Sequence, residues 1–289
     1  MVQPTITLSN GIEMPQIAFG FFQIPPGDAT YKATLAALKA GYRKIDTAHA
    51  YFNERDVAKA VKDSGIPRKE IWITSKLWPT EYGEGKTFPA IERMLKRLGT
   101  DYLDLIYLHQ ADGDYLGAWK DLEKAYEQKK VRAIGISNFD FTDELWNSIV
   151  ETARIKPHMT QVELHPYFQR RHLRELCAKY NIKIDCYYPV GGRGSGGSLL
   201  KHPVIGKIAE SHHRSPAQIL LRWHVQQGLS PLPGSTNPEH IAENLRIFDF
   251  ELTEPEMEQI AALDKNTRLS GITHADIPGI IKQFPVQDD

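Results

Sequence analysis

The chain has 289 residues, of which 41% are hydrophobic and 25% are charged, the composition of an ordinary globular protein. A formal net charge of -1, together with the lack of any apolar run of roughly 18 residues, argues against a nucleic-acid-binding or membrane protein. The N-terminus lacks a signal-peptide pattern and the two cysteines, Cys177 and Cys186, exclude a disulfide framework, so we expect a cytoplasmic protein.

The predicted elements begin with a β-hairpin in residues 4–16, where polar and apolar residues alternate on both sides of Asn10-Gly11. Strands are then expected at residues 17–21, 43–46, 71–75, 103–108, 131–136, 159–163, 182–187 and 229–232. Helices are expected near residues 28–40, 54–64, 86–98, 115–129, 142–153, 169–180, 203–212 and 238–245. Eight alternating units predict a (β/α)8 TIM barrel formed by residues 1–289 as one domain, with the hairpin capping its bottom.

Titratable residues follow three of the predicted strands. Asp46 ends the strand at 43–46 and precedes Tyr51, while Lys76 and His109 follow the next two strands. Because the carboxyl ends of parallel barrel strands share one rim, these four side chains are expected to converge there.

Such a group is suited to proton transfer. Tyr51 would be the general acid for a carbonyl oxygen, with Lys76 lowering the pKa of its phenol, which is otherwise near 10. Asp46 would anchor Lys76, and a neutral His109 would orient the substrate. Each residue also has a structural interpretation: Asp46 as a helix cap, Tyr51 as an interface aromatic, and Lys76 and His109 as ordinary loop residues.

The segment from Asp46 to Glu54 reads Asp-x-Ala-x-x-Tyr-x-Asn-Glu. Further motifs occur along nearly the whole chain: Asn10–Pro15, Lys76–Trp78, Tyr107–His109, Gly135–Phe139, Gln161–Pro166, Pro233–Ser235 and Glu243-Asn244. Together they resemble the motifs of the aldo-keto reductase family, and the chain looks like an aldehyde, xylose or 2,5-diketo-gluconate reductase-like member.

The resemblance implies a nicotinamide dinucleotide bound across the C-terminal rim, and a small-molecule carbonyl as the substrate. Ser137, Asn138 and Gln161 would bind the carboxamide, and Tyr187 would stack on the ring. The alternatives are a helix cap for Ser137-Asn138 and a core position for Tyr187. The residues implied to bind the rest of the cofactor are Ser235, Thr236, Asn237, His240 and Asn244. Phe22, Trp78 and Gln110 would line the substrate pocket.

The sequence departs from the family pattern at several of these positions. Gly234 and His240 replace the usual Lys and Arg at the adenosine 2′-phosphate, a group that favours strong cationic partners. The resemblance favours NADPH, and these two replacements make NADH plausible. Tyr188 stands where Ser is usual, and Phe22 and Gln110 replace tryptophans.

Two further segments are assigned to the rim. The loop Gly191–Gly197 contains Gly-x-Gly-x-x-Gly outside a dinucleotide-fold context, and either approaches a pyrophosphate or is a flexible solvent loop. The tail after Lys265 is expected to overhang the barrel, as the C-terminal loop does in the family.

The predicted function is therefore NAD(P)H-dependent reduction of an aldehyde or ketone, by a monomer or weak dimer. One alternative is a non-catalytic dinucleotide-binding sensor or structural relative, although an intact set of Asp46, Tyr51, Lys76 and His109 argues against it. A barrel hydrolase or metal enzyme is the other alternative, and the adjacent His212-His213 lacks the spacing of metal ligands.

Overall fold

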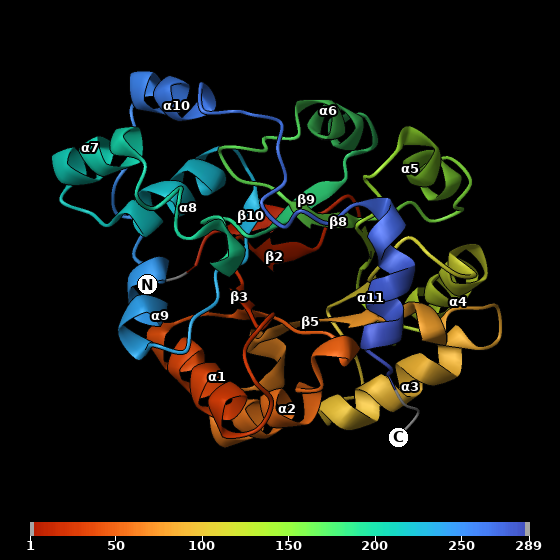
Figure 1. The fold of residues 1–289 in the computed structure, drawn as a ribbon. Helices are drawn as coiled ribbons and strands as arrows, with labels where there is room; N and C mark the ends of the chain where they lie inside the picture. Colours follow the sequence, from red (N-terminus) through yellow and green to blue (C-terminus); the bar gives the residue numbers. More distant parts are fainter. Residues whose placement is uncertain (1–2, 287–289) are drawn as a thin grey trace.

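A computed structural model describes residues 3–286 as a parallel eight-stranded sheet surrounded by helices (Figure 1). The strands follow one another in chain order through the sheet, from β3 to β10. They are β3 (Phe19–Gly20), β4 (Lys44–Asp46), β5 (Trp72–Leu77), β6 (Leu105–Leu108), β7 (Ile134–Ser137), β8 (Met159–Glu163), β9 (Lys183–Tyr187) and β10 (Ser230–Pro231). All eight predicted strands are present, within a few residues of their predicted positions.

Backbone hydrogen bonds join the first and last strands. The amide of Ala18 donates to the carbonyl of Pro231 at 3.2 Å, and the amide of Gly20 donates to the carbonyl of Pro233 at 3.0 Å. The sheet therefore closes on itself, and the predicted (β/α)8 barrel is confirmed.

The helices form an outer ring around the strands. Those predicted are α1 (Asp28–Ala40), α2 (Glu54–Asp63), α3 (Thr87–Leu98), α4 (Tyr115–Glu127), α5 (Asp143–Val150), α6 (Arg171–Tyr180), α7 (Pro203–His212) and α9 (Pro238–Leu245). Three more were not predicted: α8 (Pro216–Gln226), α10 (Glu254–Ala261) and α11 (Ile277–Gln283). Both α8 and α10 begin with a capping box and an early proline, which are start signals visible in the sequence. Within residues 3–286, no helix combines the length and apolar character needed to cross a membrane.

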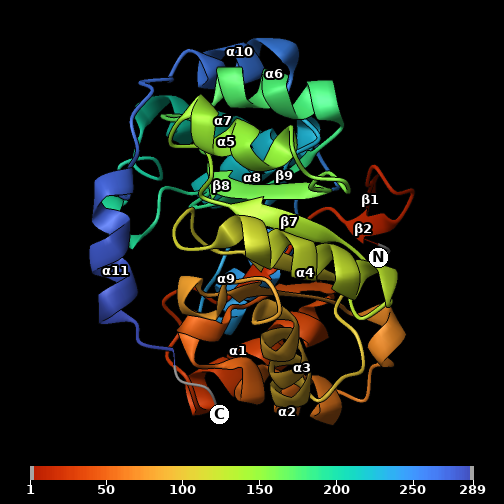
Figure 2. The same cartoon turned by 90° about the vertical axis from the view of Figure 1, so that its right-hand side faces the viewer.

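The N-terminal hairpin packs against one end of the barrel. Strands β1 (Thr5–Thr7) and β2 (Glu13–Pro15) pair antiparallel, and Gly11 adopts a left-handed φ of 81° in the turn between them. Leu8 and Met14 pack against Trp72 and other buried residues at the beginnings of the barrel strands. The hairpin and α11 lie at opposite ends of the barrel (Figure 2), so the hairpin caps the end away from the C-terminal rim.

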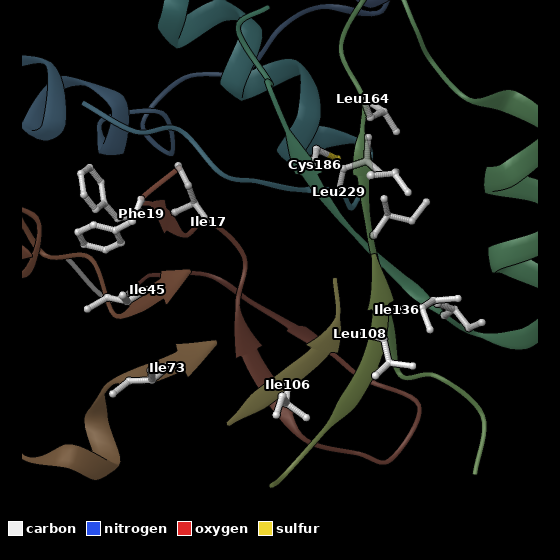
Figure 3. Packing of buried hydrophobic residues seen from close by; sticks show 14 of the residues in the cluster. Ile17, Phe19, Ile45, Ile73, Ile106, Leu108, Ile136, Leu164, Cys186 and Leu229 are labelled. Atoms are coloured by element: carbon white, nitrogen blue, oxygen red, sulfur yellow. The ribbon is translucent and has the colours of Figure 1, made fainter. Parts of the chain in front are cut away.

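Alternate residues of each strand point to opposite faces, and the two faces differ in chemistry. Side chains such as Ile45, Ile73 and Ile106 belong to the main hydrophobic core (Figure 3). Lys44, next to Ile45, has its Nζ 2.5 Å from Asp185 Oδ1, with both side chains fully buried. A buried ion pair therefore joins β4 to β9, two strands that are not neighbours in the sheet.

The segment after Lys265 crosses the C-terminal rim. The amide of Lys265 bonds to the carbonyl of Tyr167, beyond β8. Farther along, His274 Nε2 lies 3.1 Å from the carbonyl oxygen of Ala111, beyond β6, and the ring of Phe284 lies 6.3 Å from that of Trp78, beyond β5. The predicted overhanging tail is present, and part of it is the helix α11.

Candidate active site

Asp46 and Lys76 form a buried ion pair at the rim. Lys76 Nζ lies 2.5 Å from Asp46 Oδ1 and donates a second hydrogen bond, at 2.8 Å, to the carbonyl of Thr47. The other carboxylate oxygen of Asp46 accepts a hydrogen bond from Gln161 Nε2 at 2.8 Å. Three strands, β4, β5 and β8, therefore fix the positions of these groups.

Tyr51 and His109 lie close to this pair. Tyr51 ends a 3₁₀ turn, His49–Tyr51, that follows β4. Lys76 Nζ lies 4.9 Å from the centroid of the Tyr51 ring, and the Tyr51 and His109 ring centroids are 5.6 Å apart. The barrel thus brings together the four side chains that the sequence predicts at this rim.

The protonation of these groups is controlled mainly by burial. Burial raises the pKa of Tyr51 well above its ordinary value, and the carboxylate of Asp46 acts in the same direction. The net direction of this shift follows burial, and the expectation that Lys76 lowers the pKa of Tyr51 stays a prediction. Burial and the charge of Lys76 hold the pKa of His109 well below its usual range. At neutral pH the site presents a protonated phenol beside a neutral imidazole.

A buried His–Glu contact connects two of the rim loops. His49 Nδ1 lies 2.9 Å from Glu81 Oε1, and Glu81 Oε2 accepts a hydrogen bond from the amide of Trp78 at 2.8 Å. His49 belongs to the turn that carries Tyr51. The loop with the candidate general acid is therefore fixed to the loop after β5.

A pocket of about 180 Å³ opens at this rim, and Asp46, Tyr51 and His109 line it. It is also lined by most of the predicted nicotinamide and substrate residues: Phe22, Gln110, Ser137, Asn138, Gln161 and Tyr187. Several lining residues were not predicted as site residues, among them Gln23, Ile24, Phe141, Tyr188, Ser270 and Ile272. Most of these lie in loops or in the tail, where neither periodicity nor a strand end marks them.

Asn138 connects His109 to Tyr187, another residue predicted to bind the nicotinamide. Its Nδ2 donates to the carbonyl of His109 at 3.0 Å, and its Oδ1 accepts from the Tyr187 hydroxyl at 2.9 Å. Asn138 adopts a left-handed φ of 62°, a conformation that asparagine tolerates better than most residues. The amide and the aromatic ring are thus held together at the ends of β7 and β9.

Trp78, expected in the substrate pocket, lies outside the pocket lining, and Tyr188 lies within it. Trp78 is 2% exposed, and the rings of His109 and Phe284 lie 5.0 Å and 6.3 Å from its own. Tyr188 lines the pocket, and its ring lies 6.0 Å from that of Phe22. A Cβ on Gly192 would come within 2.7 Å of the Tyr188 ring, so the glycine loop makes room for this tyrosine.

The predicted adenosine-side residues lie outside the pocket lining. Ser235, Thr236 and Asn237 form the connection between β10 and α9, while His240 and Asn244 lie on α9. A Cβ on Gly234 would lie 2.4 Å from the carbonyl oxygen of Gly20, so no lysine fits there without a backbone shift. Asn237 Oδ1 already accepts a hydrogen bond from the backbone amide of Glu239 at 2.9 Å. This hydrogen bond caps the first turn of α9.

Comparison with known proteins agrees with this geometry. The model of the Aldo/keto reductase family matches residues 16–265. The 9,11-endoperoxide prostaglandin H2 reductase of Trypanosoma cruzi is 43% identical over 275 residues, covering 95% of this chain and 96% of that protein. The glyoxal reductase of Bacillus subtilis is 40% identical over 269 residues, covering 93% of this chain and 95% of that protein.

Solved structures give the same result. The aldo-keto reductase of Bombyx mori, in complex with NADP, superimposes with a TM-score of 0.86 at 30% identity and covers 99% of both chains. An aldo/keto reductase from Brucella melitensis gives a TM-score of 0.85 at 39% identity, covering 91% of this chain and 100% of that one. The chain therefore belongs to the aldo/keto reductase family and is an oxidoreductase.

Proposed function

We propose that this enzyme reduces an aldehyde or ketone to an alcohol, with Tyr51 donating the proton to the carbonyl oxygen. The observation that carries the proposal is the juxtaposition of Tyr51 and His109 in one pocket, above the buried Lys76–Asp46 pair. A protein that only binds a dinucleotide has no need of a general acid, so this arrangement favours catalysis over a sensor role.

Each of the four rim residues has its own role in the proposed reaction. Tyr51, protonated at neutral pH, holds the proton at its hydroxyl until the carbonyl oxygen gains negative charge. Neutral His109 donates a hydrogen bond to the same oxygen and orients it. The Asp46 carboxylate keeps the Lys76 cation in place, and that cation stabilises negative charge developing on the phenol.

A nicotinamide dinucleotide fits the pocket by the chemistry of its wall. Ser137, Asn138 and Gln161 offer hydroxyl and amide groups for a carboxamide, and Tyr187 offers an aromatic ring for stacking. The cofactor, when bound, supplies the hydride. We propose NADPH as the cofactor, with NADH as an effective alternative, because no lysine fits at Gly234 and His240 replaces an arginine.

The pocket favours uncharged carbonyl compounds. Asp46 is the one acidic side chain of the described lining, which includes no lysine or arginine. A keto acid would find no cationic partner on this wall, whereas the aromatic rings of Phe22 and Tyr188 suit an apolar or aromatic substrate. The names of two relatives, an endoperoxide reductase and a glyoxal reductase, add an endoperoxide and a dicarbonyl to the substrates to test.

The deciding experiment is the initial rate with an aromatic aldehyde, using NADPH and NADH in parallel. We expect turnover with both cofactors and a modest preference for NADPH. Dinucleotide binding without turnover across aromatic aldehydes, glyoxal and an endoperoxide would support the sensor role instead.

We also propose that residues 1–289 act as one domain, as a cytoplasmic monomer or weak dimer.

His240→Arg should increase the preference for NADPH over NADH. An arginine at this exposed position adds a charge-assisted hydrogen bond to the 2′-phosphate, for which we expect a gain of roughly 3- to 10-fold in the ratio of kcat/KM values. His240→Gln, which adds no charge, is the matched control and should leave the ratio nearly unchanged. An unchanged ratio for the arginine variant would place the 2′-phosphate away from α9.

A further inference from the structure

Glu163, the last residue of β8, anchors the C-terminal tail. Its side chain is fully buried, and its Oε1 accepts the backbone amides of Leu269 at 2.5 Å and Ser270 at 3.2 Å. Its Oε2 accepts the hydroxyl of Ser270 at 2.5 Å. A single carboxylate therefore holds two consecutive tail residues at the rim, although more than a hundred positions separate them in the sequence.

The carboxylate is well suited to remain ionised. Burial alone would raise the pKa of Glu163, but hydrogen bonds from His165, Ser270 and the Leu269 amide hold it below its ordinary value. His165 Nε2 lies 3.0 Å from Glu163 Oε1, and Arg268 Nη1 lies 4.0 Å from Oε2. An ionised carboxylate can only accept hydrogen bonds, so the Ser270 hydroxyl must be the donor in their contact.

This contact determines what Ser270 offers to the pocket. Ser270 lines the pocket wall, and its one hydroxyl proton is committed to Glu163. A hydroxyl oxygen has two acceptor lone pairs, and the amide of Ile272 approaches one of them at 3.4 Å. The remaining lone pair lets Ser270 Oγ accept a hydrogen bond. The negative charge of the Glu163 carboxylate makes this oxygen a stronger acceptor.

We propose that Ser270 Oγ is a ligand-binding acceptor for an N–H or O–H group of a bound molecule, and that Glu163 is the residue that positions it. Two groups have this chemistry: the carboxamide N–H of the nicotinamide cofactor and a hydroxyl adjacent to the substrate carbonyl. The inference rests on the proposed reductase function, because that function supplies both ligands.

The position of Glu163 supports this assignment. Gln161, proposed to bind the carboxamide, lies two residues earlier on β8 and therefore on the same face of the strand. Glu163 itself is paired in register with Tyr187, the proposed stacking ring. The Glu163–Ser270 contact thus belongs to the wall where the nicotinamide and the reacting carbonyl are expected to meet.

Ser270→Ala removes the acceptor and should weaken the contact that it makes. We expect a roughly 3- to 10-fold effect, typical of one hydrogen bond. If the donor is the carboxamide, the Kd for NADPH measured by protein fluorescence rises, while the Kd for the 3-acetylpyridine analogue, which has no amide N–H, stays unchanged. If the donor is a substrate hydroxyl, the KM for lactaldehyde rises relative to that for propanal, and both Kd values stay unchanged.

Glu163→Gln should raise the same quantity as Ser270→Ala, either the Kd for NADPH or the KM for lactaldehyde relative to propanal. The new amide can donate to Ser270 Oγ and occupy the lone pair that the ligand needs. Thr267→Ala is the matched control, because its hydroxyl is also in the tail and donates to the carbonyl of Lys265, within the tail itself. This control should leave Kd and KM unchanged.

The outcomes separate the inference from the function on which it rests. A wild-type enzyme that reduces no carbonyl contradicts the proposed function, and the two Kd measurements still test the carboxamide contact. A wild-type enzyme that turns over normally, with neither Kd nor the KM ratio altered by Ser270→Ala, overturns the inference. If Glu163→Gln does not fold, Ser270→Ala alone decides.

Discussion

Tyr51→Phe should reduce kcat by roughly 10²- to 10⁴-fold, the usual contribution of a positioned general acid. The variant keeps the ring that packs against Phe22 and His109 and loses only the hydroxyl. The pocket and its nicotinamide residues are unchanged, so the Kd for the dinucleotide should stay within about twofold. Steady-state rates and fluorescence titration of the purified variant measure the two quantities.

The matched control is Tyr82→Phe. The Tyr82 hydroxyl also lies near His109, where it accepts the amide of Gln110 at 3.2 Å, but Tyr82 does not line the pocket. Its removal should cost little turnover. If Tyr51→Phe retained a kcat within a few-fold of wild type, another group would have to deliver the proton, and the central assignment of the proposed mechanism would fail.

Local patterns were sufficient to predict the barrel and the four rim side chains. Strand-length segments at residues 43–46, 71–75 and 103–108 mark β4, β5 and β6, and barrel topology places their C-terminal ends together. Asp46, Lys76 and His109 could therefore be located without knowing any contact. The hairpin could also be predicted locally, because Asn10-Gly11 is a residue pair typical of tight β-hairpin turns.

Features that depend on contacts between distant segments could not be predicted in this way. The Glu163–Ser270 hydrogen bond and the Lys44–Asp185 ion pair each join residues more than a hundred positions apart. Trp78 lies beside Phe284, a residue of the tail, and does not line the pocket. The raised pKa of Tyr51 results from burial, which the residue types around it in the sequence do not indicate.

Lys76→Met should cost both activity and stability, because it leaves Asp46 buried without its ionic partner. Gln161 still donates one hydrogen bond to the carboxylate, but the bond from Lys76 Nζ at 2.5 Å is lost. Breaking a buried ion pair from one side typically reduces the free energy of unfolding by about 3–5 kcal/mol. We also expect kcat to fall by at least about 100-fold, because the cation near Tyr51 is removed.

The loss of stability should depend on pH. Burial already raises the pKa of Asp46, and Lys76 is the main group that opposes this rise. Without Lys76 the pKa of Asp46 in the folded state rises further above its value in the unfolded chain. The folded state then binds the proton more tightly, so the variant loses stability as pH rises through the folded-state pKa. Urea unfolding should show a smaller difference from wild type at about pH 5 than at about pH 8.

The double variant Asp46→Asn/Lys76→Met separates the effect of the unpaired charge from the loss of the other hydrogen bond of Lys76, to the carbonyl of Thr47. It removes both charges, so no carboxylate is left unpaired, and much of the lost stability should return along with a weaker pH dependence. Activity should not return, because the cation near Tyr51 is still absent. A double variant as unstable as Lys76→Met would instead assign the loss to the hydrogen bond from Lys76 to the carbonyl of Thr47, because methionine keeps most of the buried stem.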